Sequence, residues 1–217
     1  MSSGSREDYL INILRLAGED GTVRTSKLAS FMGVAPASVT EMLRTLSEAG
    51  LVNYEKYKGV NLTKEGLETA QNIRRKHHIV ERFLTDVLDM DHQAAHNEAC
   101  LMEHAISEDS ANKICRIIGT KVDCDCGTCN NPCNNSDNLR SVADMSSGDR
   151  AVISHLRSDD ASKVRKLLSM GFIPGREVSL DSMQNNGPRV VRIGDSIIAI
   201  DHDLSKLIIL ESSSNEL

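Results

Sequence analysis

The spacing of apolar residues predicts three helices and a hairpin at the start of the chain. Apolar positions recur at helical intervals and then give way to β-like residues. The expected helices cover residues 6–18, 25–32 and 36–46, and the expected strands cover 51–54 and 60–62. A tight turn at Gly33 and Val34 joins the second and third helices. Two helices across a short turn, followed by a hairpin, predict a winged helix-turn-helix over residues 1–62.

The helical period returns in residues 63–118, where three more helices are expected. They cover residues 63–89, 91–105 and 107–118. The apolar positions in these helices exceed what a small helical unit would bury alone, so an interface between two copies of the chain is expected. The sequence therefore predicts a helical dimerisation domain and a homodimer.

The remaining chain changes character twice. Residues 119–140 have no period and are rich in Asp, Asn, Gly and Cys, which predicts a cysteine-rich linker. Residues 141–211 are β-rich, and their pattern predicts a small five-stranded barrel. The expected strands are 150–156, 177–180, 190–193, 196–200 and 206–210, with one helix at 161–170. The fold class is thus expected to be mainly α with a small β domain.

Composition favours a soluble protein of two or three small domains. The 217 residues include 26% charged and 40% hydrophobic residues, with no apolar run of transmembrane length. We find no signal-peptide pattern, so a cytoplasmic protein without a membrane partner and without a disulfide framework is expected. The net charge of −6 argues weakly against non-specific nucleic-acid binding. However, residues 1–62 carry equal numbers of basic and acidic residues, which leaves room for local basic contacts.

The second helix of the helix-turn-helix presents small and hydroxyl-bearing side chains. Such residues can approach phosphates and base edges closely, which favours binding to double-stranded DNA. A generic three-helix packing unit is the alternative, and the predicted wing makes it the weaker one. The candidate DNA-binding residues are Thr25, Ser26, Lys27, Ala35, Ala37, Ser38, Thr40, Glu41 and Lys58.

Side chains able to bind metal recur at helical spacing in residues 77–104. His96, Cys100, Glu103 and His104 fall on one helical stripe, and His77 and Glu81 form a further pair four residues apart. Imidazole, thiolate and carboxylate together suit Fe, Mn, Co, Ni or Zn better than Ca or Mg. Any one of these residues alone is typical of an ordinary helix, but six donors in two short segments favour a metal site.

A second group of donors lies in the linker. Cys124, Cys126, Cys129 and Cys133 have the spacing C-x-C-x2-C-x3-C, which is compact enough to surround one Zn²⁺ ion or an Fe–S cluster. The spacing does not decide between the two, and a linker with incidental cysteines is the alternative.

The order of these motifs resembles the diphtheria toxin repressor family of metal-dependent transcriptional regulators. The resemblance rests on Lys76-His77-His78, Glu81-Arg82, the run from His96 to Cys100, and Glu103-His104. Residues 167–175, Leu-Leu-Ser-Met-Gly-Phe-Ile-Pro-Gly, resemble the FeoA-like or SH3-like domain of its longer members. This resemblance implies a homodimer on a palindromic DNA operator, an SH3-like β-barrel at the C-terminal end, and no enzymatic activity.

The resemblance also implies which residues bind metal. Cys100, Glu103 and His104, with Asp8 from the first helix, match the family's primary regulatory site. The ancillary site is matched by His77, Glu81 and His96, with Asp160 from the SH3-like domain. Because a thiolate favours a softer ion than Mn²⁺, the expected function is an Fe²⁺-activated repressor of metal-uptake genes. A manganese-responsive regulator of the same family is the alternative.

Two function classes outside this family are weaker. A metal-dependent hydrolase or oxidoreductase would need a substrate pocket and a base, and the sequence has neither a Gly-rich phosphate loop nor a nucleophile elbow. The second class is a redox sensor governed by an Fe–S cluster in the cysteine loop.

Overall fold

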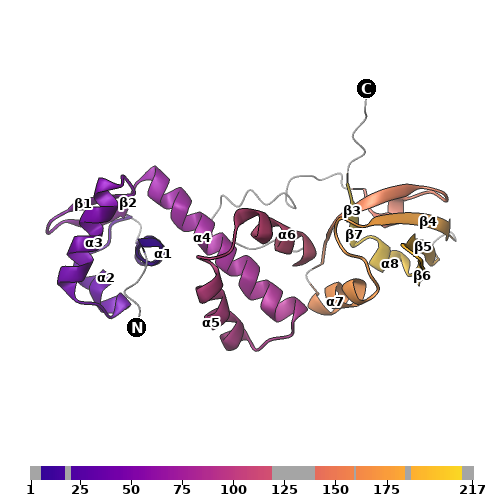
Figure 1. The fold of residues 1–217 in the computed structure, drawn as a ribbon, viewed down its shortest axis with the longest axis horizontal. Coiled ribbons are helices and arrows are strands. Elements are labelled where there is room, and N and C mark those ends of the chain that lie inside the picture. The colour runs from indigo at the N-terminus through magenta and orange to yellow at the C-terminus, as the bar shows by residue number, and fades with distance from the viewer. Residues whose placement is uncertain (1–5, 18–20, 119–139, 159, 184–186, 212–217) are drawn as a thin grey trace, which may run out of the picture. The chain divides into compact units, whose positions relative to one another are not determined.

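The computed structural model describes residues 6–17, 21–118, 140–158, 160–183 and 187–211 (Figure 1). It divides into two compact units, residues 1–77 and 78–217, and the division falls inside one helix. Most of the predicted cysteine-rich linker, including its four cysteines, lies outside the described residues.

The first unit is a winged helix-turn-helix, as predicted. Its elements are α1 (Arg6–Leu16), α2 (Thr25–Met32), α3 (Pro36–Glu48), β1 (Val52–Glu55), β2 (Gly59–Leu62) and the start of α4 (Lys64–Arg82). Gly33 ends α2 in the left-handed region at φ 66°, and Pro36 occupies the first turn of α3, where it costs no hydrogen bond. Leu10, Leu28 and Leu43 lie at the centre of a shared core to which all these elements contribute.

The wing is joined closely to the start of α4. Strands β1 and β2 pair antiparallel, with Val52 opposite Leu62. The hydroxyl of Thr63 donates to the carbonyl of Gly50 over 2.7 Å and accepts from the N–H of Gly66 over 3.1 Å. A Cβ on Gly66 would lie 1.9 Å from the carbonyl oxygen of Leu51. Glycine is therefore required here, because the helix backbone packs directly on the base of the wing.

The second unit begins with helices that are shorter than the sequence suggests. The predicted helix from 63 to 89 is α-helical only to Arg82 and then continues as a π-helical turn, η1 (Phe83–Val87). Helices α5 (His92–Met102) and α6 (Glu108–Ile118) follow. Asp91 caps α5 by accepting hydrogen bonds from the N–H groups of Gln93 and Ala94. Helix α5 ends at Met102 instead of residue 105, so Glu103 and His104 follow its last turn.

The C-terminal part is a five-stranded antiparallel sheet. Its elements are η3 (Val142–Asp144), β3 (Arg150–Leu156), α7 (Ala161–Ser169), β4 (Glu177–Met183), β5 (Arg189–Ile193), β6 (Ser196–Ile200), α8 (His202–Ser205) and β7 (Ile208–Leu210). The strand order is β6-β5-β4-β3-β7, so the five predicted strands are confirmed. The predicted barrel is not closed among the described residues: α8 carries the chain from β6 to the opposite edge, where β7 pairs with β3.

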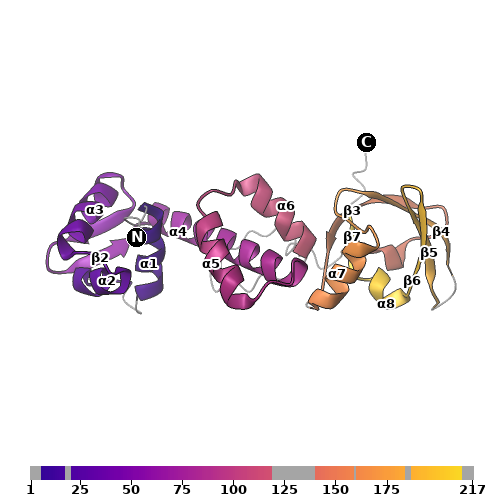
Figure 2. The ribbon, with the colours of Figure 1, turned by 60° about the horizontal axis from the view of Figure 1, so that its bottom comes forward.

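Helix α7 has two sets of contacts. Helices α7 and α8 lie beside the sheet (Figure 2). Val164 and Leu167 of α7 join the sheet core, as does Leu204 of α8. Arg165 of α7 donates to the carbonyl of Asp86 over 2.9 Å and lies 3.3 Å from the carboxylate of Asp89. This arginine satisfies a carbonyl at the π-helical turn, and it holds α7 against η1 and the residues that follow it.

Phe172 provides a test of the sheet core. It is a fully buried side chain in the cluster that joins α7 to the sheet. We expect Phe172→Ala to destabilise this domain by about 3–5 kcal/mol, because it leaves a cavity in a packed core. The matched control is Ile197→Ala on the solvent-facing side of β6, where 57% of the residue is exposed. That change is expected to cost less than about 0.5 kcal/mol. Hydrogen exchange followed by mass spectrometry over β3–β7 in denaturant measures both; equal effects would contradict the core assignment.

Candidate metal centre and nucleic-acid interface

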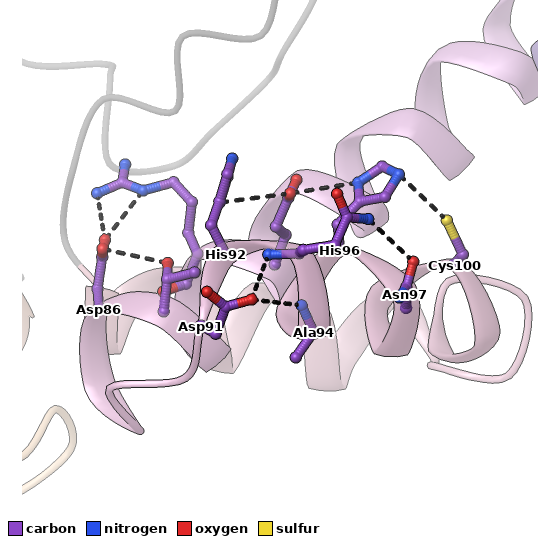
Figure 3. A network of polar contacts seen from close by, with 11 residues as sticks. Asp86, Asp91, His92, Ala94, His96, Asn97 and Cys100 are labelled. Carbon is purple, nitrogen blue, oxygen red and sulfur yellow. Dashed lines mark hydrogen bonds and ion pairs between the residues drawn. The ribbon is translucent and has the colours of Figure 1, made fainter.

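Helices α4 and α5 bring four of the predicted donors together. His96 Nδ1 lies 3.3 Å from Glu81 Oε1, and Cys100 Sγ lies 3.8 Å from His96 Nε2. Figure 3 shows the ring of His96 with Cys100 on one side and a carboxylate on the other. The exposed ring of His92 also reaches this carboxylate, with its Nδ1 3.8 Å from Glu81 Oε1. Each pair on one helix is four residues apart, so both members project from the same face.

Three of these side chains form a group with the chemistry of a metal site. His77, His96 and Cys100 each offer a donor atom, and these atoms all lie within 4.8 Å of one another. Bonds from a transition metal to imidazole and thiolate are about 2.0–2.3 Å, so one ion between such atoms could reach all three. Only 4% of His77 is exposed, and the side chain of Glu81 is 13% exposed. This burial limits competition from water on the α4 side of the group.

The grouping places Cys100 with His77 and His96. The resemblance assigned Cys100 to the other set, with Glu103 and His104. Helical spacing explains why both assignments are plausible: His96 precedes Cys100 by one turn, and Glu103 and His104 follow it by one turn. Cys100 therefore stands between the two predicted sets along α5.

The second predicted set begins where α5 ends. The N–H of Glu103 still donates to the carbonyl of Ala99 over 2.9 Å, and Glu103 is 7% exposed. His104 Nε2 lies 3.2 Å from Glu103 Oε1, so a carboxylate and an imidazole face one another here. Asp8, the predicted partner on α1, is half-buried and belongs to the first unit.

Asp160, the ancillary-site residue that the resemblance implies, caps a helix in this structure. Its carboxylate is the N-cap of α7, accepting from the N–H of Ser162 over 2.9 Å and from the Ser162 hydroxyl over 2.6 Å. The Ser162 hydroxyl holds the pKa of this carboxyl below its usual range, against a smaller effect of desolvation. The structure does not bring Asp160 into either group of donors found among the described residues.

The predicted DNA-binding residues lie mostly on the surface of the first unit. Ala35, Ala37, Ser38 and Glu41 are exposed on or just before α3, as are Ser26 and Lys27 on α2, while Thr25 and Thr40 are half-buried. The hydroxyl of Thr40 donates to the carbonyl of Pro36 over 3.0 Å. Lys58 pairs with Glu55, and this hydrogen bond raises the pKa of the lysine.

Two exposed residues of this surface were not identified from the sequence. Arg44 lies on α3, one helical turn after Thr40, and is exposed. Tyr57 lies at the tip of the wing with φ 69° and 93% exposure, next to the ammonium of Lys56. In the sequence, the signal available for Tyr57 was a large aromatic residue between two lysines, Lys56 and Lys58, a pattern that favours a contact to DNA at the wing tip.

Comparison with known proteins supports the resemblance along the chain. Residues 1–60 match the model of the iron-dependent repressor N-terminal DNA-binding domain. Residues 63–130 match the model of its metal-binding and dimerisation domain, and residues 140–212 match the FeoA domain.

Individual relatives of the chain are also transcriptional regulators. An uncharacterised HTH-type transcriptional regulator of Methanocaldococcus jannaschii is 38% identical over 113 residues, which cover 52% of this chain and 90% of that protein. The HTH-type transcriptional regulator MntR of Bacillus subtilis is 33% identical over 118 residues, covering 54% of this chain and 82% of that protein. The crystal structure of the metal-dependent transcriptional regulator MtsR, 20% identical, has a TM-score of 0.50 and covers 96% of this chain and 98% of its own, which shows a similar fold.

A winged helix-turn-helix followed by helices with clustered metal donors defines the class of metal-dependent DNA-binding regulators. The chain belongs to the iron-dependent repressor family of transcriptional regulators, the family that the sequence resemblance indicated. Among the described residues, no helix is both long and apolar enough to cross a membrane.

The donor group on α4 and α5 can be tested with Co²⁺. The four linker cysteines are first replaced by serine, so that Cys100 and Cys115 are the remaining thiols. We expect Co²⁺ to give a thiolate charge-transfer band that is lost in Cys100→Ser and weakened in His96→Ala, because sulfur and imidazole bind the same ion. Cys115, fully buried against Ile79 and Ile118, supplies the control. A band that survives Cys100→Ser and disappears in Cys115→Ala would show that this group is not the metal site.

Proposed function

We propose that this chain is an Fe²⁺-activated repressor of metal-uptake genes. It acts as a cytoplasmic homodimer on a palindromic operator, without enzymatic activity. The observation that carries the proposal is the group formed by His77, His96 and Cys100, because two imidazoles and a thiolate suit Fe²⁺ better than Mn²⁺. This donor group belongs to the same chain as a winged helix-turn-helix, which supports a regulatory role for the bound ion.

The proposed switch is an ion that Asp8 shares with Cys100, Glu103 and His104, the primary set that the resemblance implies. Asp8 is carried by α1 of the DNA-binding unit, and the other three residues lie in the last turn of α5 and just after it. Two carboxylates, a thiolate and an imidazole could together hold a divalent ion. Without metal the carboxylates repel one another. With metal the DNA-binding unit is tied to the dimer, and the recognition helices are held about 34 Å apart, one turn of DNA. A coupling of about 1–3 kcal/mol is sufficient for such regulation.

The homodimer is supported by apolar residues left exposed on the helices of the second unit. Leu88, Leu101 and Met102 are 55%, 73% and 39% exposed in the single chain. Clusters of such residues at the surface are typical of interfaces between subunits. The match to the family's metal-binding and dimerisation domain covers all three residues.

A manganese-responsive regulator is the second candidate. It is favoured by the residue types of Asp8, Glu103 and His104, because two carboxylates and an imidazole without sulfur suit Mn²⁺. The relatives named MntR point in the same direction, although they share only about a third of aligned residues with this chain.

The cysteine loop is proposed as a separate, structural site. Cys124, Cys126, Cys129 and Cys133 would hold one Zn²⁺ ion, or else an Fe–S cluster. The support is their spacing and the near absence of apolar residues around them, which leaves metal binding as the means of ordering this segment.

DNA binding should depend on metal. We expect affinity for an operator selected in vitro to fall about 5- to 150-fold when Fe²⁺ is removed by a chelator under anaerobic conditions, because the coupling between units is lost. Fluorescence anisotropy of labelled duplex measures this change. Asp8→Asn and His104→Ala should bind DNA weakly with or without Fe²⁺. Glu98→Gln, an exposed carboxylate on α5 outside both donor sets, is the matched control. Equal affinity with and without chelator would contradict the proposed switch.

The activating metal can be assigned by comparing two ions in one assay. Fe²⁺ should activate DNA binding at a lower free concentration than Mn²⁺, because the thiolate of Cys100 prefers the softer ion. In Cys100→Asp the preference should shift toward Mn²⁺. Stronger activation of the unmodified protein by Mn²⁺ would favour the manganese-responsive alternative and leave the shared-ion switch intact.

A further inference from the structure

The solvent-facing side of the C-terminal sheet carries a row of two arginines and a serine. Arg150 of β3 lies directly opposite Ser179 of β4, and Ser179 lies directly opposite Arg192 of β5. Residues paired in this way lie on the same face of an antiparallel sheet, with Cβ atoms about 4.5–5.5 Å apart. The neighbours that alternate with them, Val178 and Val191, are fully buried in the core. The pleat therefore directs this row away from the core.

The row lines an open hollow of about 510 Å³. A third arginine, Arg176, lines it from the loop just before β4, together with Glu177 and the turn at Gly194 between β5 and β6. The backbone of Arg176 is held in place, because its carbonyl accepts a hydrogen bond from the N–H of Ile153 over 2.9 Å. Three arginines thus line one hollow beside the sheet.

Positive charge in the hollow is only partly balanced. Arg192 pairs with Asp181 over 2.6 Å, but Arg150 lies 3.9 Å from Glu177 and both side chains are largely exposed. The side chain of Arg176 makes no hydrogen bond or ion pair with the rest of the described chain. Each guanidinium has five N–H donors, and most of them face solvent here. An exposed ion pair of this kind contributes little, so it does not prevent a ligand from using the same donors.

We propose that this hollow binds a small oxyanion with at least two negative charges, such as a phosphate ester or a polycarboxylate. The planar guanidinium matches the geometry of phosphate and carboxylate with two parallel hydrogen bonds. The hydroxyl of Ser179 adds a donor between two of the arginines. The volume lies in the range of small-molecule sites, which favours a compact ligand over the backbone of a long duplex.

An apolar residue lies beside the hollow. Ile197 of β6 lies directly opposite Arg192 on the same face and is 57% exposed. A ligand with both an anionic group and an apolar part fits this surface better than a bare anion. The site lies entirely within β3–β6 and the adjoining loops, so it is separate from the metal donors and does not depend on the proposed function.

Isothermal titration of the full-length, metal-free protein tests the proposal. The probes are pyrophosphate and citrate, which separate phosphate from carboxylate recognition, at constant ionic strength; metal-free protein avoids heat from chelation. We expect saturable binding of at least one probe at millimolar or lower concentration. Arg176→Gln and Arg192→Gln should each weaken it about tenfold or more, because each removes charge-assisted hydrogen bonds.

Arg157→Gln is the matched control, since Arg157 is an exposed arginine of the same domain outside the hollow. It should leave binding unchanged. An equal loss in this control would show general charge attraction and would overturn the proposal. So would the absence of saturable binding of either probe. Binding of a duplex of unrelated sequence that requires Arg176 and Arg192, without binding of the small probes, would instead identify a contact to DNA backbone and would also overturn it.

Discussion

Close packing of α5 against α4 is the contact on which the candidate metal centre depends. Ala95 and Ala99 are fully buried against Val80 and Leu84. Because both α5 residues are alanines, the helix backbones can approach one another closely. The donors occupy adjacent positions: Glu81 follows Val80, His96 follows Ala95, and Cys100 follows Ala99. Each donor is thus turned about 100° from a packing residue, toward the edge of the same contact. A larger residue at 95 or 99 would separate the helices and with them the donors.

Helix α4 also links this packing to the wing through its own continuous backbone. Its first turn is held against the carbonyl of Leu51 by the absence of a side chain at Gly66. At its other end, the π-helical turn is held by the pair of Arg82 and Asp86, 2.6 Å apart, and by Arg165 of α7. The two ends of α4 are therefore each anchored within their own unit, and the helix carries His77 and Glu81 between them.

The fold was predictable from the sequence where local rules decide the outcome. Gly33 and Pro36 mark the turn of the helix-turn-helix, and alternating residues mark β5 and the start of β4. The π-helical turn was not predictable, because Phe83–Val87 has no residue that distinguishes it from ordinary helix. The open pairing of the sheet depends on where α8 directs the chain, which is a tertiary effect. Likewise, helical spacing identified the donors, but Cys100 lies one turn from donors on both sides, and only the packing of α4 decides that His77 is its neighbour.

The charge distribution agrees with the proposed switch, in which alignment matters more than electrostatic attraction to DNA. The chain has a net charge of −6, and its DNA-binding segment has no excess of positive charge. Attraction to phosphates alone usually supplies most of the affinity of basic DNA-binding proteins, and here that contribution is small. The small residues on α3 permit close approach to DNA but add little charge. Under the proposed function, affinity would therefore come from correct placement of two DNA-binding units at once. The proposed ion would provide that placement and would also neutralise carboxylates that otherwise repel the operator.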